Sequence, residues 1–75
     1  MYSAMLDWPR DKIVSFAKSF ETLDEAVAYV NEQNEILRKE WQGDSKIFFI
    51  QKNGTQEWSL DGKDWKIDTN LIVIV

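Results

Sequence analysis

The sequence predicts an α+β fold in which one amphipathic helix packs on an antiparallel sheet of four or five strands. Residues 13–20 alternate apolar and polar side chains with the two-residue period of a strand, which places Val14, Phe16 and Phe20 on one side. Residues 23 to about 41 repeat apolar side chains at the spacing of a helix with one buried face. Two Asx-Gly dipeptides divide the remainder into three short strands. The expected order is therefore β-α-β-β-β, followed by a terminal strand.

Length and composition are those of one small domain that spans residues 1–75. With 75 residues the chain is too short for two hydrophobic cores, and 44% hydrophobic and 13% aromatic content is too apolar for a disordered chain. The sequence contains no Cys and no His, so neither disulfide bonds nor a Cys/His zinc site can stabilise the fold. We expect stability to come from aromatic packing, from a partner or from a second copy of the chain.

Start and stop signals define the helix. Thr22 and Glu25 have the spacing of a capping box, and Gly43 is a suitable C-terminal stop. Asn34 interrupts the apolar face, where it is either a hydrogen-bonded buried amide or a residue that faces a sheet edge, with a specificity contact as a further alternative. The remaining residues of this face are Leu23, Ala26, Val27, Val30, Leu37 and Trp41.

Tight hairpins would determine how the last three strands pair. Asn53-Gly54 and Asp61-Gly62 favour two-residue turns of type I′, in which both residues have positive φ angles. Such turns place Phe49 opposite Trp58, and Trp58 opposite Trp65. On the other face, Glu57 falls opposite Lys66 as an ion pair. The face expected beneath the helix consists of Ile47, Phe49, Trp58, Leu60, Trp65 and Ile67.

The segment from Leu71 to Val75 is apolar on both faces of a strand. An unpaired apolar strand invites aggregation, so we expect it to pair within the sheet or with a second copy of the chain. A homo-oligomer formed through this segment is one consequence.

Acidic residues concentrate in the helical part of the chain. The net charge is −4, and residues 20–45 hold seven Asp or Glu residues against two Lys or Arg residues. This surface is either an ordinary solvated helix face or a docking site for a protein with a basic surface. The residues proposed for such a site are Tyr29 and Ile36 with the flanking Glu25, Glu32 and Glu35.

The second candidate surface is the sheet face that the helix is not expected to cover. It carries Phe48, Ile50, Lys52 and Lys66. The apolar pair is covered by residues 1–9, is covered in an oligomer, or forms a binding patch. Aromatic rings beside lysines suit nucleic acid or a small anionic ligand, although the net negative charge disfavours nucleic acid.

The missing residue types exclude much chemistry. Without His or Cys there is no Ser-His or Cys-His nucleophile, no thiolate and no imidazole ligand for a metal. Asp61 and Asp64 flank the second hairpin, but the turn already explains Asp61. We expect no enzymatic activity, no cofactor and no metal. The longest apolar run has five residues and no signal sequence is visible, so we expect no membrane span and a cytoplasmic location, in a bacterium or a phage-infected host.

Residues 22–30, which read Thr-Leu-Asp-Glu-Ala-Val-Ala-Tyr-Val, and residues 58–65, which read Trp-Ser-Leu-Asp-Gly-Lys-Asp-Trp, contribute to one resemblance. A strand, a capped helix and a meander in this order resemble the layout of small phage anti-defence proteins, including some anti-CRISPR inhibitors. The resemblance implies a non-enzymatic, stoichiometric inhibitor that binds a host defence protein, and it transfers no site residue. The alternatives are a small module for nucleic acid or an anionic ligand, and an oligomeric subunit of a larger assembly.

Overall fold

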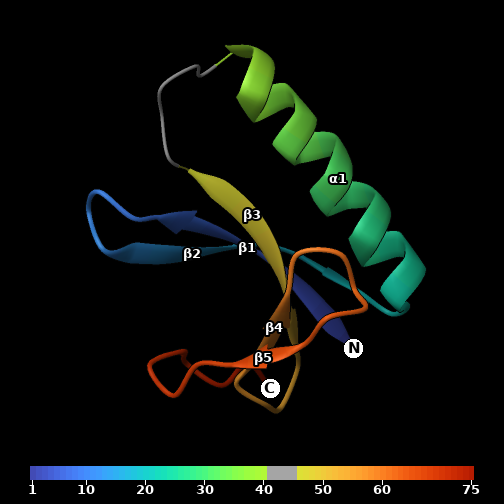
Figure 1. Ribbon diagram of the computed structural model, residues 1–75. Coiled ribbons are helices and arrows are strands. Elements are labelled where there is room, and N and C mark those ends of the chain that lie inside the picture. Colours follow the sequence, from blue (N-terminus) through green and yellow to red (C-terminus); the bar gives the residue numbers. More distant parts are fainter. Residues whose placement is uncertain (41–45) are drawn as a thin grey trace.

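The computed structural model describes residues 1–40 and 46–75, and it shows one helix packed on a five-stranded antiparallel sheet (Figure 1). The elements are β1 (Tyr2–Trp8), β2 (Ile13–Phe20), α1 (Leu23–Glu40), β3 (Ile47–Lys52), β4 (Glu57–Ser59) and β5 (Lys66–Ile67). Within the sheet the strands lie in the order β2-β1-β3-β4-β5. The predicted α+β class is confirmed, with the chain order β-β-α-β-β-β.

Strand β1 is the element that the sequence did not predict. It pairs with β2 on one side and β3 on the other, and its residues 3–5 are buried. Within β1, apolar and polar side chains alternate in the run from Leu6 to Trp8, so the two-residue period of a strand is short here. Residues 1–9 therefore do not fold over the sheet as a cover; most of them belong to it.

Helix α1 begins at the predicted capping box. The Thr22 hydroxyl accepts a hydrogen bond from the backbone N–H of Glu25 (3.3 Å) and donates one to the Glu25 carboxylate (2.8 Å). Acidic residues lie in the first turn and basic residues in the last, as the helix dipole favours. The predicted stop at Gly43 and the end of the apolar face at Trp41 fall outside the described residues.

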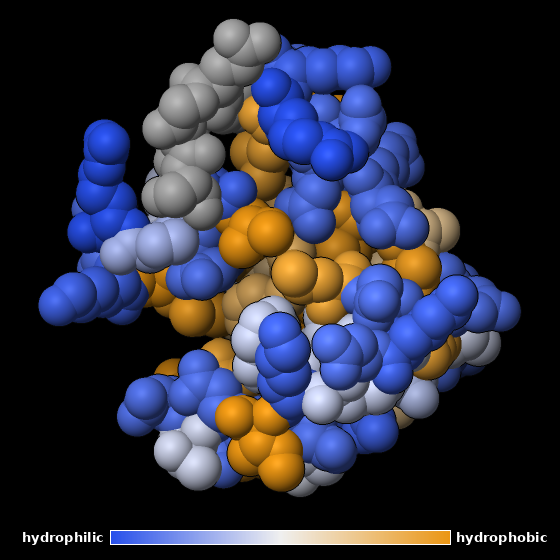
Figure 2. All heavy atoms as spheres, viewed as in Figure 1, coloured by the Kyte–Doolittle hydropathy of each residue, from blue (hydrophilic) through white to orange (hydrophobic). Residues whose placement is uncertain are grey.

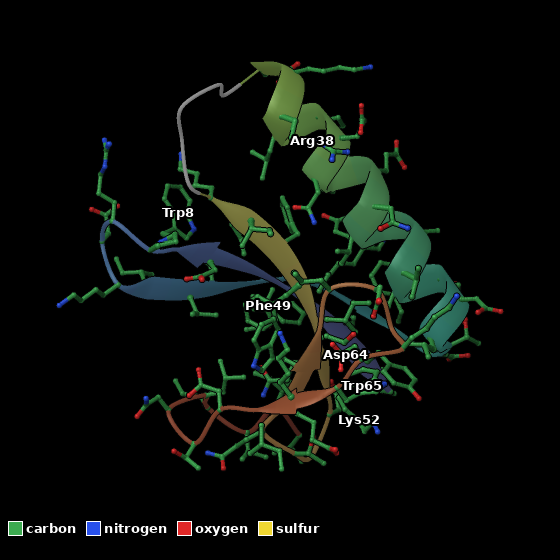
Figure 3. The ribbon with its side chains drawn as sticks, viewed as in Figure 1. Trp8, Arg38, Phe49, Lys52, Asp64 and Trp65 are labelled. Carbon is green, nitrogen blue, oxygen red and sulfur yellow. The ribbon has the colours of Figure 1, made fainter. Side chains whose placement is uncertain are left out.

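The helix covers the opposite face of the sheet from the one predicted. Its buried Ala26 and Val30 pack in one cluster with Ala4, Phe48 and Ile50. Phe49, from the middle of β3, points away from α1 (Figure 3). The periodicity of β3 could not decide between its faces, because β3 is buried on both: Phe48, Phe49 and Ile50 are 8%, 5% and 0% exposed.

Asn34 joins the helix to the backbone of β3. Its side-chain amide donates to the Phe48 carbonyl oxygen (3.0 Å), and its amide oxygen accepts from the Phe48 backbone N–H (2.7 Å). Of the predicted alternatives, the position that faces a sheet edge is confirmed, and the amide is hydrogen-bonded but half-buried.

The hairpin registers differ from the predicted ones because the loops are longer. Gly54 and Gly62 have positive φ angles but Asn53 and Asp61 do not, which excludes type I′ turns. Trp58 pairs with Gln51 instead of Phe49, a shift of two residues that keeps it on the same face as Phe49. Its partner in β5 is Lys66 instead of Trp65, a shift of one residue. That shift turns Trp65 toward the helix side, where it packs against the core.

The register shift also separates the predicted ion pair. Glu57 lies opposite Ile67, and its carboxylate is 3.7 Å from the ammonium group of Lys52. The ammonium group of Lys66 instead lies 5.4 Å from the ring centroid of Trp58.

An irregularity in β2 divides its apolar side chains between the two faces. Ala4 pairs with Lys18 but Met5 pairs with Phe16, so one residue of β2 is unpaired between them. Val14 and Phe16 consequently face away from the helix, whereas Phe20 packs on Tyr29 of α1 (5.2 Å between ring centroids). The predicted single apolar side of residues 13–20 is therefore wrong.

Residues 71–75 do not form the predicted strand. The side-chain amide of Gln56 donates to the backbone carbonyl of Leu71 (2.9 Å), and that of Gln51 donates to the carbonyl of Ile72 (2.7 Å). The backbone N–H of Gly54 donates to the carbonyl of Ile74 (2.5 Å). Hydrogen bonds from side chains and a loop thus replace a β ladder and hold the segment to its own chain. Pairing with a second copy stays a prediction.

The two hairpin glycines provide a matched test of this packing. Both need a left-handed backbone, but a Cβ atom at Gly54 would meet no atom within 4 Å, whereas one at Gly62 would lie 2.6 Å from Cγ2 of Val27. We expect Gly54→Ala to cost about 1–2 kcal/mol of unfolding free energy, from the backbone alone. Gly62→Ala should cost about 1–3 kcal/mol more, because it also overpacks the contact with α1. Urea denaturation measures both, and equal losses would contradict the packing of this loop on the helix.

Candidate functional site

The face of the sheet turned away from α1 carries the most distinctive surface of the molecule, which we call the open face. The register places alternate residues of the three longest strands on this side. Its members on the strands and directly after β4 are Ser3, Met5, Asp7, Val14, Phe16, Ser19, Ile47, Phe49, Gln51, Trp58, Leu60 and Lys66. Val14, Phe16 and Leu60 are 42%, 54% and 42% exposed, so apolar side chains on this face remain in contact with water.

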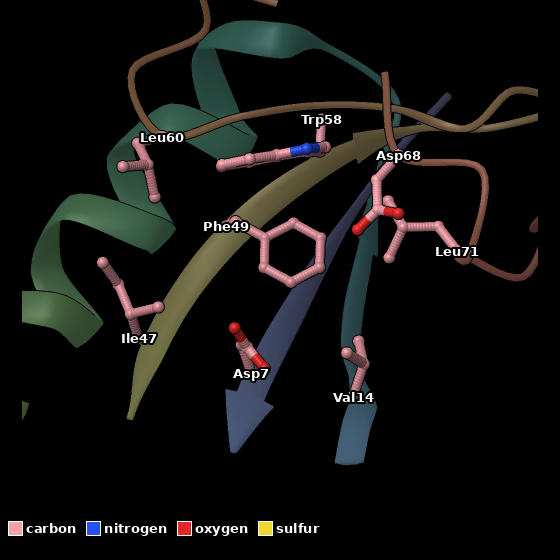
Figure 4. A pocket seen from close by; sticks show the side chains of 8 residues that line it. All are labelled: Asp7, Val14, Ile47, Phe49, Trp58, Leu60, Asp68 and Leu71. Carbon is pink, nitrogen blue, oxygen red and sulfur yellow. The ribbon is translucent and has the colours of Figure 1, made fainter. Parts of the chain in front are cut away.

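A groove of about 210 Å³ runs across the open face (Figure 4). It lies between the β1–β2 hairpin and the C-terminal part of the chain, where Figure 2 shows an indentation with hydrophobic side chains at its edge. The lining residues are Asp7, Val14, Ile47, Phe49, Trp58, Leu60, Asp68 and Leu71.

Two aromatic rings form the floor and one wall of the groove. Phe49 and Trp58 meet edge to face, with 5.8 Å between ring centroids and 69° between ring planes. This edge-to-face geometry is favourable for aromatic pairs. The ammonium group of Lys66 already lies by the Trp58 ring and Phe49 is 5% exposed, so a ligand would reach only a small part of either ring.

Among the described residues, Asp7 and Asp68 are the charged ones in the groove lining. Asp7 lies on β1 between Val14 of β2 and Ile47 of β3, and its carboxylate has no hydrogen bond or ion pair in residues 1–40 and 46–75. Asp68 accepts one hydrogen bond, from the backbone N–H of Asn70 (2.9 Å). The two carboxylates approach the Phe49 ring from different sides (Figure 4). The groove is therefore apolar at its base and negative at its sides.

Leu60 is held at the rim by a turn organised by Asp61. The Asp61 carboxylate accepts hydrogen bonds from the backbone N–H groups of Asp64 (3.0 Å) and Lys63 (2.8 Å) and from the Ser59 hydroxyl (3.0 Å). These bonds, the one from Asp64 first, lower the pKa of Asp61 from 3.8 to about 2. The prediction that the turn explains Asp61 is confirmed.

The residues predicted on the helix do not form one free surface. The Tyr29 ring packs between Phe20 and Phe48, at centroid distances of 5.2 and 6.0 Å. Glu25 takes part in the capping box, and the Glu35 carboxylate is paired with Arg38 and, at 3.9 Å, with Lys39. Glu32 and Ile36 remain exposed.

The second predicted surface is divided by the structure. Phe48 and Ile50 lie beneath α1, so the expectation that they face away from the helix is wrong. Lys52 also lies on the face that α1 covers, and its ammonium group is 4.6 Å from the Trp65 ring centroid. Lys66 lies on the open face, beside Trp58. These four residues cannot contact one ligand together.

A second hollow, of about 190 Å³, lies at the turn between β1 and β2, and its lining residues are Trp8, Pro9, Arg10, Asp11 and Lys46. Lys46 stacks on the Trp8 ring at 4.1 Å, and the buried indole N–H has no acceptor in the described part of the chain. With both signs of charge in its lining, this hollow indicates no ligand class.

Sequence reasoning missed Asp7 and Asp68 because neither belongs to a motif. Asp7 lies in the unpredicted strand, and Asp68 follows a strand of only two residues. The alternation of Asp7 with the apolar Leu6 and Trp8 was the one available signal for a strand here.

Comparison of this chain with models of protein families, with curated proteins and with solved structures finds no match. Residues 1–40 and 46–75 contain no group of three or more acidic side chains arranged to hold a metal ion. In the same residues, no helix combines the length and the apolar character needed to cross a membrane.

Because its pKa is depressed, Asp61 should make stability depend on pH. Its hydrogen bonds stabilise the fold fully above pH 3.8, and this contribution is lost as the pH falls toward about 2. We expect the melting temperature of the wild type to fall further between about pH 5 and about pH 2 than that of Asp61→Asn, which has no proton to bind in this range. Asp64→Asn, which removes a nearby exposed carboxylate, should follow the wild type. Parallel losses in the wild type and Asp61→Asn would show that the turn does not depend on the ionised carboxylate.

Proposed function

We propose that this chain is a non-enzymatic protein-binding module whose binding surface is the groove on the open face. The observation that supports it is a largely apolar groove on the face that α1 does not cover, with the exposed Val14 and Leu60 in its lining. Contiguous apolar patches on small proteins usually mark interaction sites, because leaving them in water is unfavourable. An aromatic base with exposed aliphatic side chains at its edge is typical of a protein interface.

The alternative docking surface on α1 has weaker support. Of the five residues predicted there, Tyr29 is engaged in the core, while Glu25 and Glu35 are engaged within the helix and its cap. A partner that used Glu35 would have to compete with Arg38 and Lys39 of the same helix. Few carboxylates on this face are therefore available to bind a partner.

A nucleic-acid partner is disfavoured by the charges in the groove. Asp7 and Asp68 would lie near phosphate groups, and the lining contains no Lys or Arg. A protein partner has no such conflict. We place this binding in the cytoplasm of a bacterium or a phage-infected host, and inhibition of a host defence protein stays a prediction from the resemblance.

Neighbouring residues of β2 provide a matched pair of variants for a test. Val14 lines the groove and Ile13 points to the opposite face, and both are exposed, at 42% and 54%. In Val14→Lys, the new side chain should occupy the groove and pair with Asp7, and Ile13→Lys makes the same chemical change outside it. Thermal melts followed by circular dichroism establish that both variants fold.

We expect the two variants to capture different sets of proteins from a lysate of the native cells. Partners bound by the wild type and by Ile13→Lys should be depleted at least tenfold with Val14→Lys in quantitative mass spectrometry, which corresponds to about 1.4 kcal/mol of binding free energy. Equal capture by the two variants would contradict binding through the groove.

A further inference from the structure

The two carboxylates of the groove determine what kind of side chain can enter it. Asp7 lies among apolar neighbours on β2 and β3, and its carboxylate has no partner in the described part of the chain. A partner that covers this carboxylate removes water from it, which is costly unless a cation or hydrogen-bond donors replace that water. Among the described residues, the groove lining supplies no cation of its own. The cation or hydrogen-bond donors that replace this water would therefore come from the partner.

The remaining walls suit the rest of a long basic side chain. The methylene stem of a lysine or arginine packs on apolar surface while its charged end reaches a polar group. Here the Phe49 ring lies between the two carboxylates, with Ile47 and Leu60 at the same edge (Figure 4). A cation above an aromatic ring gains a further electrostatic contribution.

The volume of the groove indicates one side chain and not a free small molecule. Sites for small ligands usually enclose about 300–1,000 Å³. The present groove encloses about 210 Å³ and opens onto the exposed Val14 and Leu60. An apolar surface around the entrance suits an occupant that extends beyond it, as a protein segment does.

From these observations we propose that the groove binds a lysine or arginine side chain from an apolar segment of a partner protein. The charged end lies between Asp7 and Asp68, and the stem packs on Phe49 and Trp58. This inference rests on the proposed function, because it names the chemistry of the partner for the same groove. The flanking apolar residues of the partner contact Val14 and Leu60.

Selection from a displayed library of random ten-residue peptides tests the inference without knowledge of the partner. Wild-type protein serves as the target, and enriched peptides are then synthesised and measured against three folded variants. Asp7→Asn with Asp68→Asn removes the two groove carboxylates while keeping the shape of each side chain. Glu32→Gln with Glu35→Gln removes two carboxylates from α1 as the matched change in charge. Val14→Lys blocks the groove.

We expect enriched peptides to contain a Lys or Arg beside apolar residues. Their affinity should fall at least tenfold with the groove double variant and with Val14→Lys, and by less than twofold with the helix double variant. Peptides that Val14→Lys rejects, but that lack a basic residue or bind the groove double variant as tightly as wild type, would overturn this inference and leave the proposed function standing. If no peptide is enriched, or if Val14→Lys binds every enriched peptide as well as wild type, both are contradicted.

Discussion

The pair of hydrogen bonds between the Asn34 amide and the backbone of Phe48 is the constraint on which the arrangement of helix and sheet depends. Strand β4 pairs with β3 only at Ile50 and Gln51, so it does not reach Phe48. Asn34 supplies one donor and one acceptor there, as a residue of a neighbouring strand would. Leaving such buried backbone groups without partners costs about 1–3 kcal/mol each, which favours one position of the helix along β3.

This attachment also decides which side of the sheet remains open. With α1 fixed beside Phe48, the small side chains of Ala4 and Ala26 allow helix and sheet to approach closely over Ile50. One helix of 18 residues covers one face of a five-stranded sheet, and the described part of the chain has no second helix for the other. The Phe49–Trp58 pair shields part of that other face, but the apolar groove beside it stays exposed. The proposed binding surface is thus a consequence of the two-layer architecture.

Local signals in the sequence predicted the parts of the fold that depend on neighbouring residues. The capping box at Thr22 and the helix that follows it belong to this group, and the break that Asn34 makes in the apolar face indicated its hydrogen-bonded role. The face covered by the helix was not predictable in the same way, because β3 is apolar on both sides and the alternation of apolar and polar residues in β1, from Leu6 to Trp8, is short. The turn registers depended on hydrogen bonds that the side chains of Ser59 and Asp61 accept from the backbone N–H groups of Gly62 and Lys63 in the longer second loop. The groove combines residues from both of these unpredicted features.

The most direct test of this account is to measure which methyl groups meet solvent, by NMR relaxation with a soluble paramagnetic agent. The account predicts strong relaxation enhancement for the methyl groups of Val14 and Leu60 at the groove, and protection of those of Val30 and Ile50 between helix and sheet. Protection of Val14 and Leu60 together with enhancement at Ile50 would show that the helix covers the other face, and would contradict both the fold described here and the groove.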